Sequence, residues 1–297
     1  KNMQSIGIIG LGIMGLACAR RLEEAGFPVC GYDPFGPAVE RAKAAGVAVH
    51  DSPKAVAAAS DAVIMFVPGP AEAEQVVLGD SGLRAGMRPG GIIANMSTVD
   101  PGVNIRLGKA VEPEGIVLMD TPVLGGPAGV GHWAFAVGGE DEALERLMPV
   151  LEALGGARDR VFHVGPLGHG NKLKLLNNMM LGAINACAAE TMALAERMGL
   201  SQKTLTDVAV AAKGRILSDV YVEIGERIAE SRYDSPTFTL NMLTKDNQLC
   251  LNMAREYGAP LVLGNAVDYI NRMAVAQGLG PEDHACVWKS VSRNWKE

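Results

Sequence analysis

Residues 10–15 read Gly10-Leu11-Gly12-Ile13-Met14-Gly15, and this stretch decides the fold of the first half of the 297-residue chain. An apolar run at residues 4–9 precedes it and predicts a β-strand, and residues 14–25 follow it with the pattern of an amphipathic helix. Glycines at this spacing allow a tight turn and a close approach of the backbone to a pyrophosphate, whose charge the helix N-terminus attracts. The stretch therefore predicts a dinucleotide-binding turn, with a plain structural turn as the alternative.

Asp33 ends the second predicted strand, residues 28–32, and bears on which dinucleotide binds. A carboxylate at this place accepts hydrogen bonds from ribose hydroxyls but repels a 2′-phosphate, which needs Arg or Lys nearby. No cation follows Asp33 before Arg41. The sequence therefore favours NAD over NADP. The alternative is that Asp33 only forms a turn before Pro34.

Short apolar runs alternate with amphipathic stretches up to about residue 165, which is typical of βαβ units and a mostly parallel sheet. The predicted strands are residues 4–9, 28–32, 47–50, 62–67, 91–95, 115–119, 133–137 and 161–164. The predicted helices between them are residues 14–25, 37–45, 72–77, 103–111 and 140–154. The first half is therefore predicted to be an α/β Rossmann-like domain, residues 1–165.

The strand pattern stops after residue 164, and residues 171–198 contain no proline and one glycine. They predict one long interdomain helix that joins the first domain to an all-α second domain, residues 166–297. Few polar residues interrupt its first half, so we expect this helix to be buried on most sides, by both domains or by a partner subunit. Further helices are predicted at residues 202–212, 216–230, 241–257, 261–277 and 283–292.

Composition disfavours several classes of protein. The 27 Lys and Arg against 33 Asp and Glu give a net charge of −6, and aromatic residues make up only 5%, so nucleic-acid binding is not expected. No apolar run is long enough to span a membrane. Five widely spaced cysteines with no C-x-x-C pair, and histidines with no ligand spacing, predict no metal site and favour a reducing cytoplasm.

A second glycine-rich turn, residues 165–170, leads into the long helix and is followed by two lysines. Lys174 and Asn178 are four residues apart and share a helix face, with Asn177 beside them. A lysine beside amides can give or take a proton, and an asparagine can hold a hydroxyl in line. Lys172 lies about 200° around the helix from Lys174, so it is read as a solvated surface lysine.

Six motifs follow one another along the chain. They are Gly10-Leu11-Gly12-Ile13-Met14-Gly15, Val67-Pro68, Asn95-Met96-Ser97-Thr98-Val99-Asp100-Pro101, Asp120-Thr121-Pro122-Val123-Leu124-Gly125-Gly126, Gly168-x-Gly170-x3-Lys174-x2-Asn177-Asn178, and Phe238 through Lys245-Asp246. With these motifs, essentially the whole chain resembles the β-hydroxyacid dehydrogenase family, which includes 3-hydroxyisobutyrate dehydrogenase and tartronate semialdehyde reductase.

The resemblance implies roles for particular side chains. In that family the lysine that matches Lys174 is the catalytic acid and base, and the amide that matches Asn178 positions the substrate. The amides of Gly125 and Gly126 are implied to bind the substrate carboxylate, and we expect Ser97, Leu124 and Asn177 to border the substrate as well. The cofactor is expected to contact Gly10, Leu11, Gly12, Ile13, Met14, Gly15, Asp33, Val67, Pro68, Thr98 and Lys245. Ser97-Thr98 is also read as a helix N-cap before Asp100-Pro101.

Three positions depart from the family pattern. Leu124 stands where serine is usual, Asn95 where aspartate is usual, and His132-Trp133-Ala134 where Gly-Thr-Leu or similar is usual. A leucine donates no hydrogen bond, so we expect it to give apolar contact to the substrate, with Trp133 extending that contact. Arg215 is a candidate second clamp for a carboxylate.

Together these observations predict an NAD-dependent oxidoreductase that passes hydride between nicotinamide and a small 3-hydroxy acid in a cleft between the two domains. Self-association through the helical domain, as a dimer or tetramer, is expected. The alternatives are an imine reductase or other related nicotinamide enzyme, and a catalytically silent NAD-sensing module.

Overall fold

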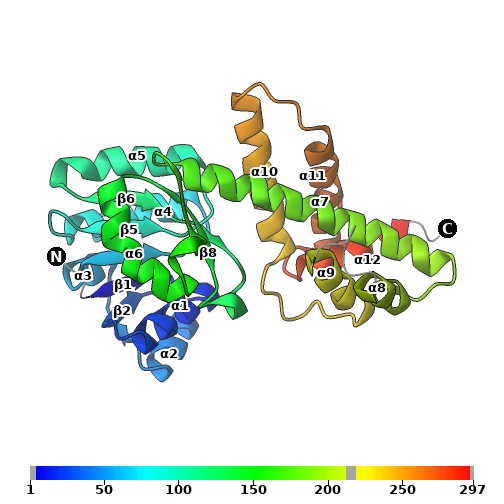
Figure 1. The fold of residues 1–297 in the computed structure, drawn as a ribbon, viewed down its shortest axis with the longest axis horizontal. Coiled ribbons are helices and arrows are strands. Elements are labelled where there is room, and N and C mark those ends of the chain that lie inside the picture. The colour runs from blue at the N-terminus through cyan, green and yellow to red at the C-terminus, as the bar shows by residue number, and fades with distance from the viewer. Residues whose placement is uncertain (1–4, 212–218, 295–297) are drawn as a thin grey trace. The chain divides into compact units, whose positions relative to one another are not determined.

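The protein is described by a computed structural model that covers residues 5–211 and 219–294 (Figure 1). The chain divides into two compact units, Lys1–Lys174 and Leu175–Glu297. The division falls inside helix α7 (His169–Arg197), shortly after the boundary predicted at residue 165. Each unit is described by itself below.

The first unit is built on a nine-stranded sheet of order β3-β2-β1-β4-β5-β6-β8-β7, with β9 paired to β8. Its strands are β1 (Ile6–Ile9), β2 (Val29–Tyr32), β3 (Ala48–Val49), β4 (Ala62–Met65), β5 (Ile92–Asn95), β6 (Val117–Asp120), β7 (Val123–Leu124), β8 (Ala134–Gly138) and β9 (Val161–Gly165). Strands β1 to β6 are parallel, and β8 runs antiparallel to β6 and β7. The order 3-2-1-4-5-6 is that of the Rossmann fold, so the predicted fold class is confirmed.

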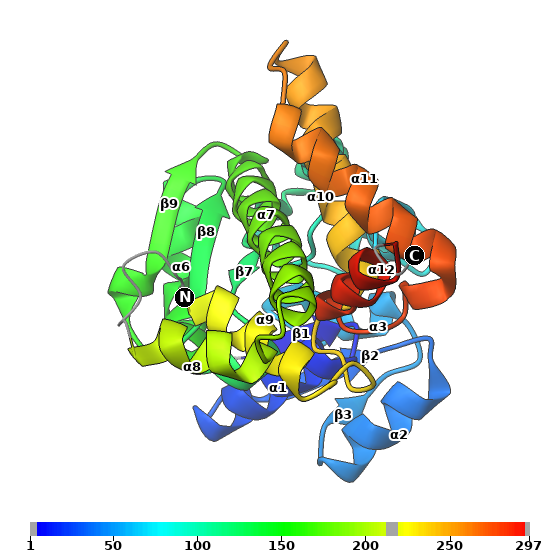
Figure 2. The same ribbon diagram turned by 90° about the vertical axis from the view of Figure 1, so that its right-hand side faces the viewer.

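Helices cover both faces of this sheet, as Figures 1 and 2 show. They are α1 (Ile13–Glu24), α2 (Gly36–Ala44), α3 (Pro53–Ala58), α4 (Pro70–Leu78), α5 (Pro101–Val111) and α6 (Asp141–Gly155). Side chains of α1, α2 and α6 share one buried cluster with the sheet, and those of α3, α4 and α5 share the other. Because both faces are covered, β1, β4 and β5 are buried along their whole length.

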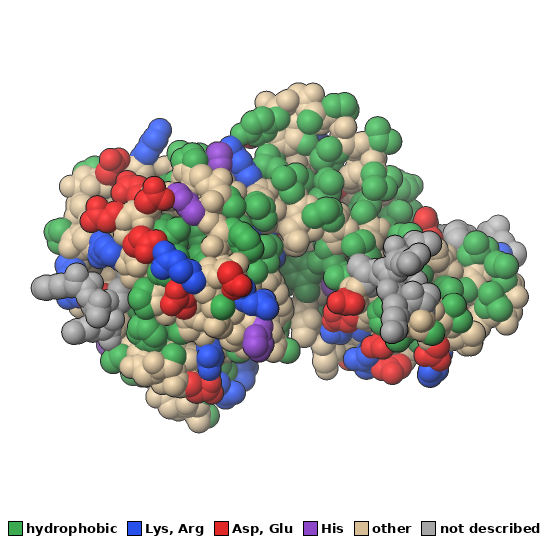
Figure 3. Space-filling model, in the orientation of Figure 1, with side chains coloured by type: hydrophobic (Ala, Val, Ile, Leu, Met, Phe, Trp, Pro, Cys, Tyr) green, Lys and Arg blue, Asp and Glu red, His purple; other side chains and the backbone are tan. Residues whose placement is uncertain are grey.

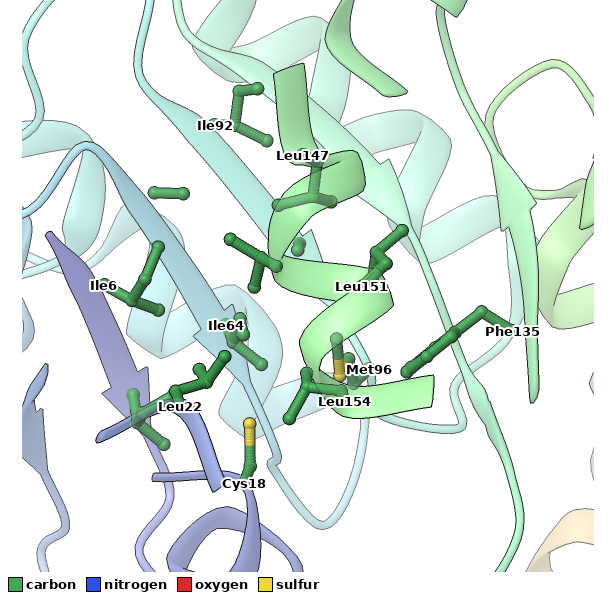
Figure 4. Close-up of a cluster of buried hydrophobic side chains, with 14 of the residues drawn as sticks. Ile6, Cys18, Leu22, Ile64, Ile92, Met96, Phe135, Leu147, Leu151 and Leu154 are labelled. Carbon is green, nitrogen blue, oxygen red and sulfur yellow. The ribbon is translucent and has the colours of Figure 1, made fainter. Parts of the chain in front are cut away.

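Figure 4 shows part of the first cluster, in which Leu147, Leu151 and Leu154 of α6 lie over Ile64 and Ile92 of the sheet. These three leucines recur every three or four residues, so they share one face of α6. The repeat places that whole face in the core, as a helix covering a sheet requires.

Three local features differ from the sequence-based predictions. Helix α3 and strand β7 were not predicted, because six residues and two residues are too short to show a clear period. The N-cap of α5 is Asp100, whose carboxylate accepts a hydrogen bond from the Gly102 amide at 2.8 Å. The predicted N-cap at Ser97-Thr98 is therefore wrong, because Asp100 lies directly before the first helical residue.

The second unit is helical over its described residues, as predicted. After α7, its helices are α8 (Gln202–Ala211), α9 (Asp219–Ala229), α10 (Leu240–Glu256), α11 (Val262–Ala274) and α12 (Val287–Asn294). Apolar side chains from α7, α9, α10, α11 and α12 form one buried cluster. No helix within the described ranges is both long and apolar enough to cross a membrane.

Helix α7 is one uninterrupted helix of 29 residues, close to the predicted range 171–198. The expectation that it is buried on most sides holds only in part within a single chain. Leu176 and Met180 are 50% and 56% exposed. Lys172 is half-buried and makes a contact, so it is not the solvated lysine that its helix position predicted.

Candidate active site

The glycine-rich turn follows β1 and opens α1. Gly10 has a φ of +88°, and a Cβ there would lie 2.0 Å from the Phe66 carbonyl oxygen. A Cβ on Gly15 would lie 1.7 Å from the Gly10 carbonyl oxygen. Both positions therefore require glycine, because the turn packs against the end of β4 and against itself.

Gly12 is different, because a Cβ there would meet nothing within 4 Å. It is the N-cap of α1 and makes no side-chain cap hydrogen bond. The first amides of α1 and the open side of Gly12 form a cradle of the kind that accepts a phosphate group. The residues at this turn therefore fit the pyrophosphate of a dinucleotide.

Asp33 lies directly beyond β2 and is held by two backbone amides. Its Oδ2 accepts a hydrogen bond from Leu11 N at 2.7 Å, and its Oδ1 accepts one from Phe35 N at 2.8 Å. The carboxylate thus ties the end of β2 to the glycine-rich turn. Each carboxylate oxygen can accept more than one hydrogen bond, so Asp33 keeps capacity for ribose hydroxyls.

The loops after β4 and β5 are joined through Ser97. Its hydroxyl accepts a hydrogen bond from Val67 N at 2.8 Å and donates to the Met65 carbonyl at 3.3 Å. Ser97 is 4% exposed, and its amide donates to Asn95 Oδ1 at 3.0 Å. Ser97 therefore shapes the loop that holds Val67 and Pro68, and its contact with substrate stays a prediction.

Parallel strands bring these segments to one edge of the sheet. The carboxyl ends of β1 and β4 are neighbours at the point where the strand order reverses, and β5 lies next to β4. Ligands of open α/β sheets bind at this edge. The Gly10–Gly15 turn, Val67-Pro68 and Thr98 follow these three strands, so the fold brings these predicted cofactor residues to the same edge of the sheet.

The start of α7 is fixed by Asp120, the last residue of β6. Asp120 is fully buried, and its two oxygens accept hydrogen bonds from Gly168 N at 2.8 Å and Asn171 N at 2.6 Å. Asn171 Oδ1 in turn accepts from Val99 N at 3.0 Å. The first turn of α7, three residues before Lys174, is therefore anchored to the ends of β5 and β6.

Burial raises the pKa of the Asp120 carboxyl above its usual value, although the amides of Asn171 and Gly168 act in the opposite direction. A carboxylate removed from water is disfavoured in its charged form, and two backbone donors offset this only partly. The anchor of α7 therefore rests on a buried carboxyl group whose pKa burial raises.

The predicted acid-base face of α7 carries Lys174 and Asn178 one turn apart. The Asn178 side chain is 2% exposed, and its Nδ2 donates to Asp246 Oδ2 of α10 at 2.7 Å. Its Oδ1 accepts from Asn177 Nδ2 at 3.1 Å. Lys245 Nζ lies 3.0 Å from Asp246 Oδ1. The amide of Asn178 is therefore held in one orientation by its neighbours.

The predicted carboxylate-binding residues lie between β7 and β8. Leu124 is half-buried and pairs with Ala134 across the two strands. Trp133 was expected to extend an apolar surface for the substrate, and this expectation is wrong because its side chain is 0% exposed. The indole packs instead behind the turn, and its Nε1 donates to the Gly126 carbonyl at 2.7 Å.

Several residues of the site were given no role from the sequence, although Asp120 and Asp246 stand within its motifs. Asp120, Asn171 and Asp246 act through hydrogen bonds to segments 48 to 72 residues away. The signal that was available for Asp120 was a charged residue directly after the apolar run of β6. Arg215, the candidate second clamp, lies outside the described residues. Within those residues, no group of three His, Cys, Asp or Glu side chains is arranged to hold a metal ion.

Comparison with known proteins places both halves of the chain in families. Residues 5–165 match the model of the NAD binding domain of 6-phosphogluconate dehydrogenase. Residues 168–291 match the model described as NAD-binding of NADP-dependent 3-hydroxyisobutyrate dehydrogenase. The two matches together cover both units.

Individual relatives align along nearly the whole chain. Mitochondrial 3-hydroxyisobutyrate dehydrogenase of Mus musculus is 32% identical over 290 residues, covering 96% of this chain and 86% of the mouse protein. NAD-dependent L-serine dehydrogenase of Pseudomonas aeruginosa is 32% identical over 293 residues, covering 97% of each chain.

A solved structure, 3-hydroxyisobutyrate dehydrogenase from Salmonella typhimurium, superposes with a TM-score of 0.88 at 27% identity and covers 96% of this chain and 99% of its own. All three of these relatives are named as dehydrogenases. The chain belongs to the β-hydroxyacid dehydrogenase family, as its six motifs predicted.

Proposed function

We propose that this protein oxidises a small 3-hydroxy acid with NAD, or reduces the corresponding semialdehyde or keto acid, and that Lys174 is its general acid and base. The observation that carries the proposal is the face of α7. Lys174 follows a helix start that Asp120 anchors, and Asn178 has an amide that Asp246 holds in place. A buried, oriented amide one turn from a lysine suits the binding of a hydroxyl and the transfer of its proton.

Bound NAD supplies the acceptor for the hydride that leaves the carbinol carbon. The protein's part is to hold the hydroxyl and to move its proton. In the oxidation, the hydroxyl proton passes to a neutral Lys174 Nζ as the carbonyl forms, and in the reduction the ammonium returns it. Asn178 holds the hydroxyl in line, and the amides of Gly125 and Gly126 bind the carboxylate.

Asp33 supports the choice of NAD. Its carboxylate stands at the end of β2, where the ribose of a dinucleotide lies in this fold. The 2′-phosphate of NADP would meet this negative charge, and residues 34–38 supply no lysine or arginine to offset it. We further propose that NAD contacts Gly10 to Gly15, Asp33, Val67, Pro68, Thr98 and Lys245.

Leu124 bears on the substrate. The serine usual in the family would add a hydroxyl donor, and its loss costs about 1.5 to 3 kcal/mol when the acceptor is charged. We therefore expect 3-hydroxyisobutyrate and L-serine, the substrates that the names of the relatives carry, to be poor substrates here. The preferred acid has a larger or more apolar substituent, or a different anionic group.

The test is the formation of NADH with a panel of 3-hydroxy acids, followed by absorbance for the wild type and for Leu124→Ser. Turnover of any acid in the panel supports the dehydrogenase. Tight NAD binding with no turnover would favour an NAD-sensing module. A wild type that is efficient on hydroxyisobutyrate, and that is not improved by serine, would show that Leu124 only packs.

We also propose a cellular compartment and an oligomeric state for this protein. All five cysteines are free thiols, which agrees with a reducing compartment such as the cytoplasm. We further propose that the protein acts as a homo-oligomer formed through the helical unit, without nucleic-acid or membrane partners.

A further inference from the structure

Trp133 lies directly before β8 and is enclosed by two aromatic rings. Its ring centroid is 6.4 Å from that of Phe66, at 61°, and 6.4 Å from that of Phe135, at 80°. Both contacts are edge-to-face arrangements that hold the indole in one orientation. Phe66 is the residue immediately before Val67-Pro68, so the indole touches the loop assigned to the cofactor.

The indole also contacts the turn after β7. Nε1 donates to the Gly126 carbonyl at 2.7 Å. Gly125 has a φ of +147°, and a Cβ on it would lie 2.9 Å from Trp133 Cδ1. The turn is therefore shaped against the indole, and no larger residue fits at position 125 without movement.

Two consecutive glycines have more backbone freedom than any other pair of residues. Amides that must bind a carboxylate need a fixed direction, because ordering them at the moment of binding lowers the affinity. Trp133 supplies the restraint: its hydrogen bond fixes the Gly126 carbonyl, and its ring limits the positions of Gly125. Leu124 removes the family's hydroxyl donor from the same turn, so binding depends more heavily on these two amides.

We propose that Trp133 is a positioning residue that holds the Gly125–Gly126 amides ready for the substrate carboxylate and links this turn to the Phe66–Pro68 loop. The inference rests on the proposed function, because it takes the carboxylate to bind at this turn.

The test compares Trp133→Phe with Trp288→Phe. Phenylalanine keeps an aromatic ring at position 133 and removes the donor together with part of the buried ring volume, a loss of volume that Trp288→Phe shares. Trp288 Nε1 is buried with no hydrogen-bond partner, so Trp288→Phe is the matched control.

In Trp133→Phe we expect KM for the hydroxy acid to rise about threefold to tenfold, which is the factor that corresponds to the loss of one hydrogen bond. We expect kcat to change by less than about twofold. The inhibition constant of the deoxy acid, which keeps the carboxylate and lacks the hydroxyl, should rise by the same factor.

The dissociation constant for NADH should stay unchanged in both variants. A wild type that turns over no hydroxy acid would overturn the proposed function. An active wild type with equal KM values for Trp133→Phe and Trp288→Phe would overturn this inference alone. A rise in KM without a rise in the inhibition constant would also overturn it, because the carboxylate would then not be involved.

A second pair of variants decides the matter if Trp133→Phe does not fold. In Gly125→Ala the new Cβ would lie 2.9 Å from Trp133 Cδ1 on a backbone whose φ of +147° favours glycine, so the turn has to move while the three aromatic side chains are unchanged. Gly129→Ala touches the same ring at an ordinary 3.7 Å and serves as its control. We expect KM to rise only in Gly125→Ala, and equal KM values in the two variants would overturn the inference.

Discussion

At the scale of single residues, Lys174 carries the chemistry of the proposal. Lys174→Ala removes the group that exchanges a proton with the hydroxyl, so we expect kcat to fall about 10²- to 10⁴-fold. NAD affinity should be spared, because Lys174 lies outside the phosphate-binding turn. Steady-state kinetics and a fluorescence titration with NADH measure the two effects.

Lys172→Ala is the matched control, since Lys172 precedes Lys174 by two residues and points to another side of α7. Equal losses in the two variants, or no loss in either, would show that Lys174 is not the acid-base group.

A second prediction for a single residue concerns Asp33 and the choice between NAD and NADP. Repulsion between its carboxylate and a 2′-phosphate should make NADPH bind about a hundredfold more weakly than NADH, which corresponds to a few kcal/mol. Titration of both reduced cofactors by fluorescence measures the ratio. Equal or reversed affinities would contradict the role of Asp33.

At the scale of elements, the anchor between β6 and α7 decides how the helix with Lys174 begins. The pKa of Asp120 is raised by burial, so the native state binds this proton more tightly than the unfolded state. The contribution of Asp120 to stability is therefore full below its ordinary pKa of 3.8 and is lost as the pH rises through the raised pKa.

Asp120→Asn tests this sign because asparagine does not titrate. We expect the free energy of unfolding of the wild type, relative to Asp120→Asn, to fall by roughly 1.4 kcal/mol for each unit by which the pKa is raised. Urea unfolding of both proteins over a series of pH values gives the difference. A difference that grows with pH would mean that the two amides outweigh the effect of burial.

At the scale of the whole molecule, large apolar side chains remain exposed on the hairpin of α10 and α11. Figure 3 shows hydrophobic side chains gathered over these helices. The most exposed are Val262 at 85%, Tyr257 at 65%, Leu263 at 63% and Tyr269 at 62%. Exposed apolar side chains gathered on one hairpin are typical of an interface with another molecule, and the proposed homo-oligomer supplies a second copy.

We expect the wild type to have the mass of at least two chains by light scattering and Val262→Glu to shift toward the monomer. Burying an unpaired charge costs about 3 kcal/mol or more, a change of over a hundredfold in Kd. Val262 is the first residue of α11, where an acidic side chain suits the helix dipole, so the fold should survive. Val208→Glu, on exposed α8, is the control, and equal masses for the two variants would exclude this hairpin as the interface.

Local patterns in the sequence determined the strands, most helices, the glycine-rich turn and the face of α7 with Lys174 and Asn178. Each of these depends on residues within a few positions of one another, through the period of a helix or strand and the backbone freedom of glycine. The family followed from the order of six such patterns. Among the helices and strands of the described residues, α3 and β7 were too short for this reasoning.

The tertiary structure alone decided which side chains support the site. Asp120 accepts a hydrogen bond from the segment that begins α7, and Asp246 accepts one from Asn178. Trp133 donates a hydrogen bond to Gly126 and packs against Phe66. Strand order and helix packing bring these distant segments together. Trp133 appears in the sequence as an apolar residue fit to contact a substrate, yet antiparallel pairing of β7 with β8 turns it into the core. A hydrogen bond between distant segments has no period to reveal it, so the fold has to be known before such a contact can be named.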